Sequence, residues 1–345
     1  MIYKGLELHN IHEVVEIEGC EIFSRYPQAL NDTIKHNVAY QFTSVEIRFV
    51  PKEEVKITIG SKFSFIQPKC MIYYGDFANP EEILIDNEKT ITINPLAKFG
   101  VLVKQQAKML AKETDFSIDV IRIVLHGEGF YIKDICGAYR LPTKEEKPAK
   151  KLLSYGTSIT QGIGATSPDM SYPFILGRLL HMDAYNYALS GKCLCESEVI
   201  KYMAKTNTYE IITIEASVNM ISLGYHEDEY YKRMKELLCI LKRYQPNARI
   251  YCIDIFPYWA DMGFRNPEQQ MVSSSQKYKM KLKQLTNELD DFNIQYINAS
   301  ECISIHNLSS DLIHPANHGM VEIAYHLASI LQQKSVLNSS WVKDK

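Results

Sequence analysis

The second half of the chain opens with LLSYGTSITQG at residues 152–162, an apolar strand that runs directly into a turn of small and hydroxylated residues. Strand-like and helix-like patterns alternate from there onward. Strands are expected at 152–155, 184–188, 211–215, 249–256 and 294–297, and helices at 172–180, from about 195, at 229–243, near 272–289 and from about 317. This alternation predicts a doubly wound parallel α/β sheet with ligands beyond the carboxyl ends of its strands.

The first 142 residues have a different pattern, that of short strands. Residues 44–50 and 54–59 alternate apolar and polar side chains, which predicts strands with one buried and one exposed face. Further strand-like runs follow at 70–74, 82–85, 90–93 and 119–125, and one helical candidate lies at about 104–112. Many short strands separated by turn residues predict an antiparallel β-sandwich.

A charged segment with two prolines, LPTKEEKPAKK at residues 141–151, separates the two patterns. It has few large apolar groups and is therefore expected to be an exposed connection. The predicted organisation is a β-sandwich domain at 1–142, a linker at 143–151, an α/β domain at 152–335 and a C-terminal tail at 336–345.

Composition and charge argue against several classes of protein. The 345 residues carry a net charge of -3, so the overall field favours neither nucleic acid nor an anionic membrane as partner. The sequence has no signal-like N-terminus and no long uncharged apolar stretch, so a soluble cytoplasmic protein is expected. The eight cysteines are scattered, and Cys193 and Cys195 have no second pair nearby, so reduced thiols are expected and no metal site.

Ser158 follows the first strand of the α/β half, where a parallel sheet presents side chains to a ligand. Gly156 permits a sharp turn, and the start of a helix could stabilise an anion there. The fragment does not fit a Walker loop, and Thr160 stands where the α/β-hydrolase elbow needs glycine. Taken alone, the fragment favours an ordinary turn over a nucleophile.

A second fragment, DLIHP at residues 311–315, precedes the last predicted helix. Asp311 and His314 on a tight turn can point into one cleft, where the carboxylate would fix the imidazole tautomer and stabilise the imidazolium. That is the arrangement of a general base. The alternative that stays open is a turn-capping aspartate beside a surface histidine.

Three further loops follow predicted strands. Gly191 would let a backbone N–H approach a substrate oxygen, and the Asn219 amide could supply a second donor. Tyr258 and Trp259 lie in an aromatic segment at 255–264 and could either bind a sugar face or pack against the neighbouring domain. Ordinary turns and packing remain open alternatives for all of them.

Together, the fragments resemble the SGNH (GDSL-like) hydrolases, a family of serine esterases and acyl hydrolases. The family's first block, Gly-Asp-Ser-x-Thr, matches residues 156–160 with Thr157 in place of Asp, and its last block, Asp-x-x-His-Pro, matches 311–315 fully. The second-block glycine matches Gly191, and Asn219 is what remains of the third block, Gly-x-Asn-Asp. A sandwich in front of such a domain looks like the two-domain carbohydrate esterases and some related acyltransferases.

The resemblance implies a flavodoxin-like, doubly wound hydrolase domain behind an all-β, jelly-roll-like sandwich. It implies that Ser158 is the nucleophile, His314 the general base and then acid, and Asp311 the residue that orients the histidine. The oxyanion hole would consist of the Ser158 and Gly191 N–H groups and the Asn219 side chain. Such chemistry requires neither a cofactor nor a metal.

The activity implied is hydrolysis of a short acyl ester, above all an acetyl ester of a sugar or glycoside. An acyltransferase with the same triad is the nearest alternative, because an alcohol other than water can resolve an acyl-enzyme. A non-catalytic carbohydrate-binding protein is the third. The expected partner is a small acyl ester such as an acetylated sugar, with neither nucleic acid nor membrane, and a homo-oligomer is left open.

Overall fold

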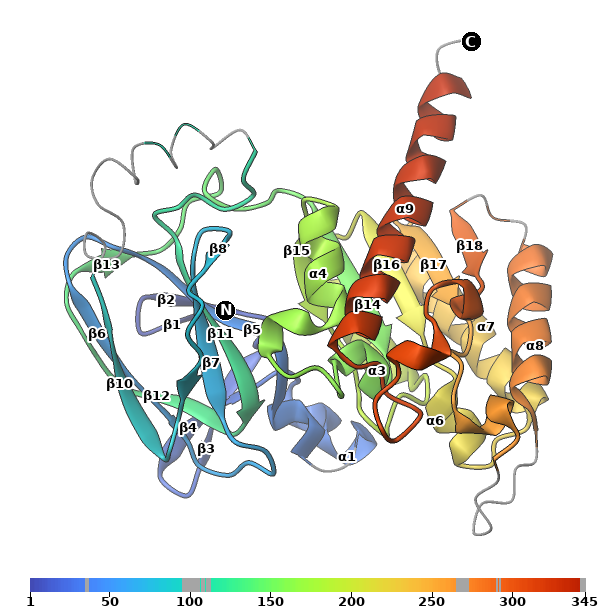
Figure 1. Ribbon diagram of the computed structural model, residues 1–345, viewed down its shortest axis with the longest axis horizontal. Coiled ribbons are helices and arrows are strands. Elements are labelled where there is room, and N and C mark those ends of the chain that lie inside the picture. The colour runs from blue at the N-terminus through green and yellow to red at the C-terminus, as the bar shows by residue number, and fades with distance from the viewer. Residues whose placement is uncertain are drawn as a thin grey trace. The chain divides into compact units, whose positions relative to one another are not determined.

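The computed structural model describes residues 1–34, 37–94, 113–264, 273–289 and 293–341, together with the single residues 106, 109 and 291. The chain divides into two compact units, Met1–Ala149 with Ser167–Asp169, and Lys150–Thr166 with Met170–Lys345. Figure 1 shows antiparallel strands in the first unit and alternating strands and helices in the second. Apart from residues 106 and 109, the helix expected at 104–112 lies outside the described residues.

The first unit is built from antiparallel strands. Its larger sheet, in the order β1-β2-β5-β11-β7-β8 with β13 on β5 and β9 on β7, contains β1 (Ile2–Tyr3), β2 (Leu6–His9), β5 (Gln41–Pro51), β7 (Lys69–Tyr74), β8 (Phe77–Ala78), β9 (Ile83–Leu84), β11 (Ile121–Glu128) and β13 (Tyr139–Arg140). The smaller sheet, in the order β10-β6-β12, contains β6 (Val55–Ser61), β10 (Glu88–Ile93) and β12 (Phe130–Cys136). The first unit also contains a two-stranded antiparallel ribbon, formed by β3 (Glu13–Ile17) and β4 (Cys20–Ser24). Three short helices follow the ribbon: η1 (Gln28–Leu30), α1 (Asn31–Ile34) and η2 (Asn37–Tyr40).

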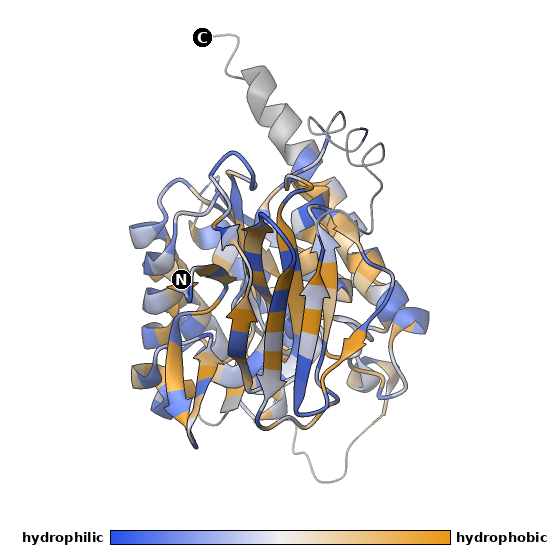
Figure 2. Cartoon of the chain, turned by 90° about the vertical axis from the view of Figure 1, so that its left-hand side faces the viewer, coloured by the Kyte–Doolittle hydropathy of each residue, from blue (hydrophilic) through white to orange (hydrophobic). Residues whose placement is uncertain are grey.

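One hydrophobic core joins the two sheets. It takes buried side chains from both, such as Ile47 and Ile123 of the larger sheet and Ile57 and Ile91 of the smaller. Figure 2 shows hydrophobic and hydrophilic residues alternating along several strands, the pattern of a sheet with one face in a core. The predicted antiparallel β-sandwich is thereby confirmed.

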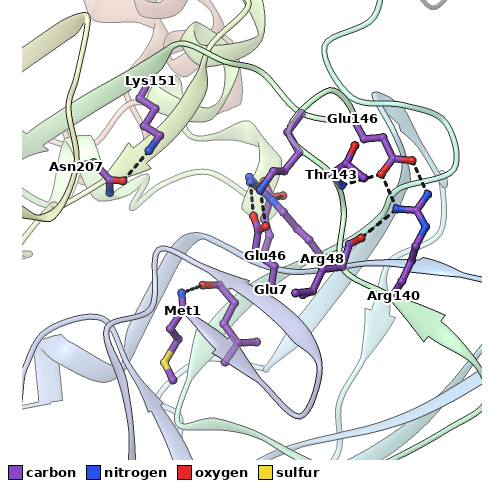
Figure 3. A network of polar contacts seen from close by, with 12 residues as sticks. Met1, Glu7, Glu46, Arg48, Arg140, Thr143, Glu146, Lys151 and Asn207 are labelled. Carbon is purple, nitrogen blue, oxygen red and sulfur yellow. Dashed lines mark hydrogen bonds and ion pairs between the residues drawn. The ribbon is translucent and has the colours of Figure 1, made fainter.

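One expectation about the sandwich is wrong, namely that β5 has an exposed polar face. Along β6, buried and more exposed positions do alternate, but Ser44, Glu46 and Arg48 of β5 are all buried. The Glu46 carboxylate lies 2.7 Å from the Arg48 guanidinium and 2.6 Å from that of Arg122, and Arg122 lies 4.0 Å from the centre of the Phe116 ring. Figure 3 shows Glu46 and Arg48 within a network of polar contacts. The paired charges of Glu46, Arg48 and Arg122 can be buried, because each keeps hydrogen-bond partners.

The second unit contains a five-stranded parallel sheet. Its strands are β14 (Lys151–Gly156), β15 (Asp183–Asn186), β16 (Ile211–Glu215), β17 (Arg249–Ile253) and β18 (Ile294–Ile297). Their spatial order is β15-β14-β16-β17-β18. Numbered along the chain, this is the flavodoxin-like order 2-1-3-4-5, which confirms the predicted doubly wound fold.

Helices cover this sheet. They are α3 (Ser158–Gln161), α4 (Tyr172–Leu179), α5 (Ser197–Thr206), α6 (Val218–Ser222), α7 (Glu227–Tyr244), α8 (Ser275–Leu289) and α9 (Asn317–Trp341), with short turns η3 (Pro168–Met170), η4 (Trp259–Met262), η5 (Ala299–Glu301) and η6 (Ile305–Asn307). Helices α4 and α9 pack on each other and share a core with the sheet, while α7 packs between α5 and α8. Helix α9 extends beyond residue 335, where the α/β domain was expected to end.

The carboxyl ends of the parallel strands present three of the expected site residues. Ser158 follows β14, Gly191 lies in the loop after β15, and Asn219 follows β16. Because parallel strands end at the same edge of a sheet, these residues lie at one edge. Among the described helices, none combines the length and the apolar character that a membrane crossing requires.

Candidate active site

Ser158 stands at the start of α3, where the chain turns sharply away from β14. A Cβ on Gly156 would lie 2.0 Å from the Thr160 hydroxyl oxygen and 2.8 Å from the Glu215 carbonyl oxygen, so only glycine fits there. Thr157 caps the helix, since its side chain accepts a hydrogen bond from a backbone N–H of the first turn. The Ser158 side chain is thereby held on a tight turn with its residue 9% exposed.

His314 lies between Ser158 and Asp311. Its Nε2 is 2.8 Å from Ser158 Oγ, and its Nδ1 is 2.6 Å from Asp311 Oδ2. Both distances are those of hydrogen bonds. The carboxylate favours the tautomer with the proton on Nδ1, so Nε2 can accept the serine proton as Oγ attacks an electrophilic carbon.

Asp311 is fixed by its own turn. Its Oδ1 accepts hydrogen bonds from the Ile313 and His314 amides, at 2.9 Å each, and from the Ser309 hydroxyl at 2.8 Å. Partial burial raises the pKa of Asp311, but the hydrogen bonds from His314, Ile313 and Ser309 outweigh it and hold that pKa well below its usual range. The carboxylate therefore stays ionised and can stabilise a protonated His314.

A glycine in the loop after α3 contacts the turn that carries the histidine. A Cβ on Gly164, whose φ is +95°, would lie 2.4 Å from the Pro315 carbonyl oxygen and 3.1 Å from the Cβ of His314. The Thr166 amide donates to the Asn317 side chain at 2.9 Å, and the Asn317 amide group donates to the Thr166 hydroxyl at 2.7 Å. These contacts hold the loop after α3 against the His314 turn.

Gly191 and Asn219 have features that suit hydrogen-bond donors. Gly191 has a φ of +67°, and no atom lies within 4 Å of a Cβ built there. Asn219 Oδ1 accepts from the Cys193 amide at 3.2 Å, so the amide NH₂ of Asn219 is the end left to donate elsewhere. The neighbouring Ser190 amide donates to the Gln161 side chain of α3 at 3.1 Å. Their place in an oxyanion hole stays a prediction.

Tyr258 and Trp259 lie close to the Asp311 turn but differ in exposure. The Trp259 amide donates to the Leu312 carbonyl at 2.9 Å. Tyr258 is 2% exposed, whereas Trp259 is half-buried, and their rings meet edge to face with centroids 5.4 Å apart. Of the two rings, Trp259 has the surface that a substrate could touch, and its contact with substrate stays a prediction.

Sequence reasoning did not single out Glu215, the last residue of β16. Its residue is 0% exposed, and its Oε2 accepts from the Thr157 amide at 3.0 Å, the Thr157 hydroxyl at 2.7 Å and the Thr160 hydroxyl at 3.1 Å. Burial raises the pKa of Glu215 to about 7, against the hydrogen bonds from Thr157 and Thr160, which lower it. The available signal is an acidic residue that ends an otherwise uncharged strand.

Two titratable groups near Glu215, Tyr172 and Cys193, are neutral in the physiological range. Burial raises the pKa of the Tyr172 hydroxyl, which bonds Thr160, and that of the Cys193 thiol, which lies near the Glu215 carbonyl. The described part of the chain contains no group of three or more His, Cys, Asp or Glu side chains that could hold a metal ion.

We expect the free energy of unfolding to fall as pH rises towards 7 because of Glu215. The carboxyl has a pKa of about 7 in the folded protein against an ordinary value of 4.5, so the folded state keeps a proton that the unfolded state has lost. This contribution is complete below the unfolded pKa and is lost as pH passes the folded pKa, a change of about 3 kcal/mol. Urea unfolding at about pH 5 and pH 8 should show a correspondingly smaller pH effect in Glu215→Gln than in the wild type. Equal pH effects would contradict the assignment.

Comparison with known proteins gives one family and several similar folds. Residues 149–332 match the GDSL-like lipase/acylhydrolase family, whereas no curated protein matches the chain. A salicylyl-acyltransferase from a tetracycline biosynthetic pathway is similar with a TM-score of 0.74 at 11% identity, over 96% of this chain and 95% of that one. A family two carbohydrate esterase from Cellvibrio japonicus has a TM-score of 0.62 at 12% identity, over 96% of each chain. An acetyl xylan esterase from the rumen bacterium Butyrivibrio proteoclasticus has a TM-score of 0.56 at 12% identity, over 87% of this chain and 93% of that one.

Proposed function

The chain belongs to the GDSL-like lipase/acylhydrolase family, and we propose that it is a serine esterase with Ser158 as nucleophile, His314 as base and Asp311 as the residue that orients the base. The observation that carries the proposal is the continuous hydrogen-bonded path from Asp311 through His314 to Ser158 Oγ. A serine hydroxyl is inert at its own pKa and needs a base in contact, which His314 provides.

In the proposed first step, Ser158 Oγ bonds to the ester carbonyl carbon while its proton passes to His314 Nε2. The negative charge that develops on the carbonyl oxygen would be stabilised by the Ser158 and Gly191 N–H groups and the Asn219 amide. Cleavage of the ester C–O bond releases the alcohol, which takes the proton from His314. Water then attacks the acyl-enzyme in the same way and releases the carboxylic acid and free Ser158.

We propose a short acyl ester of a carbohydrate as the substrate, with acetyl as the acyl group. Two structures with similar folds are named as a family two carbohydrate esterase and an acetyl xylan esterase, which supports a substrate of this class. The half-buried Trp259, tied to the Asp311 turn through Leu312, offers an aromatic face of the kind that sugars stack on.

An acyltransferase is the second candidate, and one observation favours it. The salicylyl-acyltransferase gives a TM-score of 0.74, against 0.62 and 0.56 for the two esterases. The same serine, histidine and aspartate could serve either reaction, because the acyl-enzyme is common to both and an acceptor alcohol simply replaces water.

Product analysis distinguishes the two candidates. The wild type is incubated with p-nitrophenyl acetate, with and without cellobiose or glycerol, and the released p-nitrophenol, acetate and acetylated acceptor are measured. For an esterase, we expect acetate to equal p-nitrophenol whether or not an acceptor is present. Acetylated acceptor, with acetate falling short, would establish the acyltransferase instead. Release no faster than with Ser158→Ala would contradict both.

A further inference from the structure

A buried carboxyl group lies directly behind the turn that carries Ser158. Glu215 is the register partner of Gly156 on the neighbouring parallel strand, and its side chain reaches the two hydroxylated residues on either side of Ser158. Its Oε2 receives three hydrogen bonds, two from Thr157 and one from Thr160. The turn that carries Ser158 is thus held by hydrogen bonds from β16 as well as by its connection to β14.

The position of this carboxyl group is notable because of what stands at residue 157. The first block of the SGNH hydrolases has Asp immediately before the nucleophile, and this chain has Thr157 there. The structure supplies a carboxylate to the same turn from the adjacent strand, with the Thr157 hydroxyl 2.7 Å from Glu215 Oε2. An acidic group thus contacts the turn of the nucleophile in this chain, and it comes from a different segment of the chain.

Glu215 is poorly suited to a purely structural role. Its second carboxyl oxygen, Oε1, is buried and has no hydrogen-bond partner among the described residues, and such an oxygen costs stability. Among the described residues, no cation pairs with the ionised form, and the pKa of Glu215 is set by burial and by the hydrogen bonds from Thr157 and Thr160. A carboxyl group that lowers the stability of the fold while it hydrogen-bonds the turn of Ser158 points to a role in the reaction.

We propose that Glu215 is a positioning residue that holds the nucleophile turn, through Thr157 and Thr160, in the geometry in which Ser158 Oγ meets His314. The inference rests on the proposed function of Ser158. Glu215 does not contact the reacting atoms, and it acts by fixing the backbone of residue 157 and the first turn of α3. A charged acceptor forms shorter and stronger hydrogen bonds than a neutral one, so the negative charge tightens this hold.

The test is Glu215→Gln, assayed with p-nitrophenyl acetate at about pH 8, where the wild-type carboxyl group is ionised. Glutamine can offer its carbonyl oxygen to the same three donors but lacks the charge. We expect kcat to fall on the order of tenfold, as neutral hydrogen bonds replace charge-assisted ones, with KM within about twofold of wild type. We expect the unfolding midpoint at this pH to be no lower than that of the wild type, because the buried charge is gone.

Glu210→Gln is the matched control. Glu210 directly precedes β16 and accepts a hydrogen bond from the Lys151 amide at 2.6 Å, so the same substitution is made at the amino end of the same strand. We expect kcat within about twofold of wild type there. If Glu215→Gln keeps wild-type kcat, matches Glu210→Gln in its loss, or loses kcat only together with a lowered unfolding midpoint, the positioning role is wrong.

Two further variants keep the test decisive. Should Glu215→Gln fail to fold, Thr160→Val removes one of the three donors with little change of shape. We then expect kcat to fall severalfold at unchanged KM, and a wild-type kcat would overturn the proposal.

Ser158→Ala separates the proposed function of Ser158 from the positioning role of Glu215. If that variant is as active as wild type, the proposed function fails, whereas an inactive Ser158→Ala beside a fully active Glu215→Gln defeats the positioning role alone.

Discussion

Replacing Ser158 with alanine is expected to lower turnover of p-nitrophenyl acetate about a million-fold, the order observed when a serine hydrolase loses its nucleophile. In the proposed mechanism this hydroxyl forms the covalent bond to the acyl carbon, with His314 Nε2 at 2.8 Å to take its proton. Without it, the proposed base and the proposed oxyanion donors could only assist direct attack by water.

Ser154→Ala is the matched control for that variant. Ser154 lies on β14 just before the turn, and its hydroxyl accepts a hydrogen bond from Thr213 at 2.9 Å, so a serine hydroxyl is lost from the same segment away from the reacting atoms. We expect it to keep activity within about tenfold of wild type. Both variants should retain cooperative unfolding, and a Ser158→Ala variant with near wild-type turnover would eliminate the proposed nucleophile.

Asp311→Asn is expected to lower turnover about ten-thousand-fold, the loss seen when the corresponding aspartate of a serine protease is changed. Three donors, the Ile313 and His314 amides and the Ser309 hydroxyl, approach Oδ1. The asparagine oxygen will occupy that position, which turns its NH₂ group towards His314 Nδ1. The imidazole must then carry its proton on Nε2, facing Ser158, and it can no longer act as a base.

The control for this prediction is Ser309→Ala. It removes one hydrogen bond to Oδ1 but leaves the carboxylate on His314 Nδ1, so turnover should fall by less than about tenfold. Steady-state kinetics on the three proteins decides the matter. If Asp311→Asn falls no further than Ser309→Ala, another group orients His314 and the role given to Asp311 is incorrect.

The parts of the site that could be predicted from the sequence are those carried by short local patterns. Ser158, Asp311 and His314 each lie in a contiguous motif. The alternation of strands and helices predicts that such motifs lie at the carboxyl ends of the parallel strands. Their proximity in space follows from the parallel order of the strands, which the same alternation predicts.

The features that were missed depend on contacts between distant segments. Glu46 and Arg122 are 76 residues apart. The period-two pattern of β5 therefore indicates its polar positions, but it does not show that pairing with a distant opposite charge allows them to be buried. Glu215 and Thr157 are 58 residues apart. The sequence shows that Thr157 replaces Asp, but it does not show that Glu215 bonds Thr157. Gly164 matters because a backbone carbonyl of Pro315 approaches it closely, and no local signal reports such a contact.

Trapping the acyl-enzyme shows whether Ser158 carries the acyl group during turnover. The wild type is mixed with p-nitrophenyl acetate, quenched in acid within the first turnovers, digested and examined by fragmentation mass spectrometry. We expect one acetyl group, located on Ser158, which is absent from Ser158→Ala and accumulates before steady state. An active enzyme that shows no acetylated peptide, or carries the acetyl group on another residue, would contradict the role proposed for Ser158.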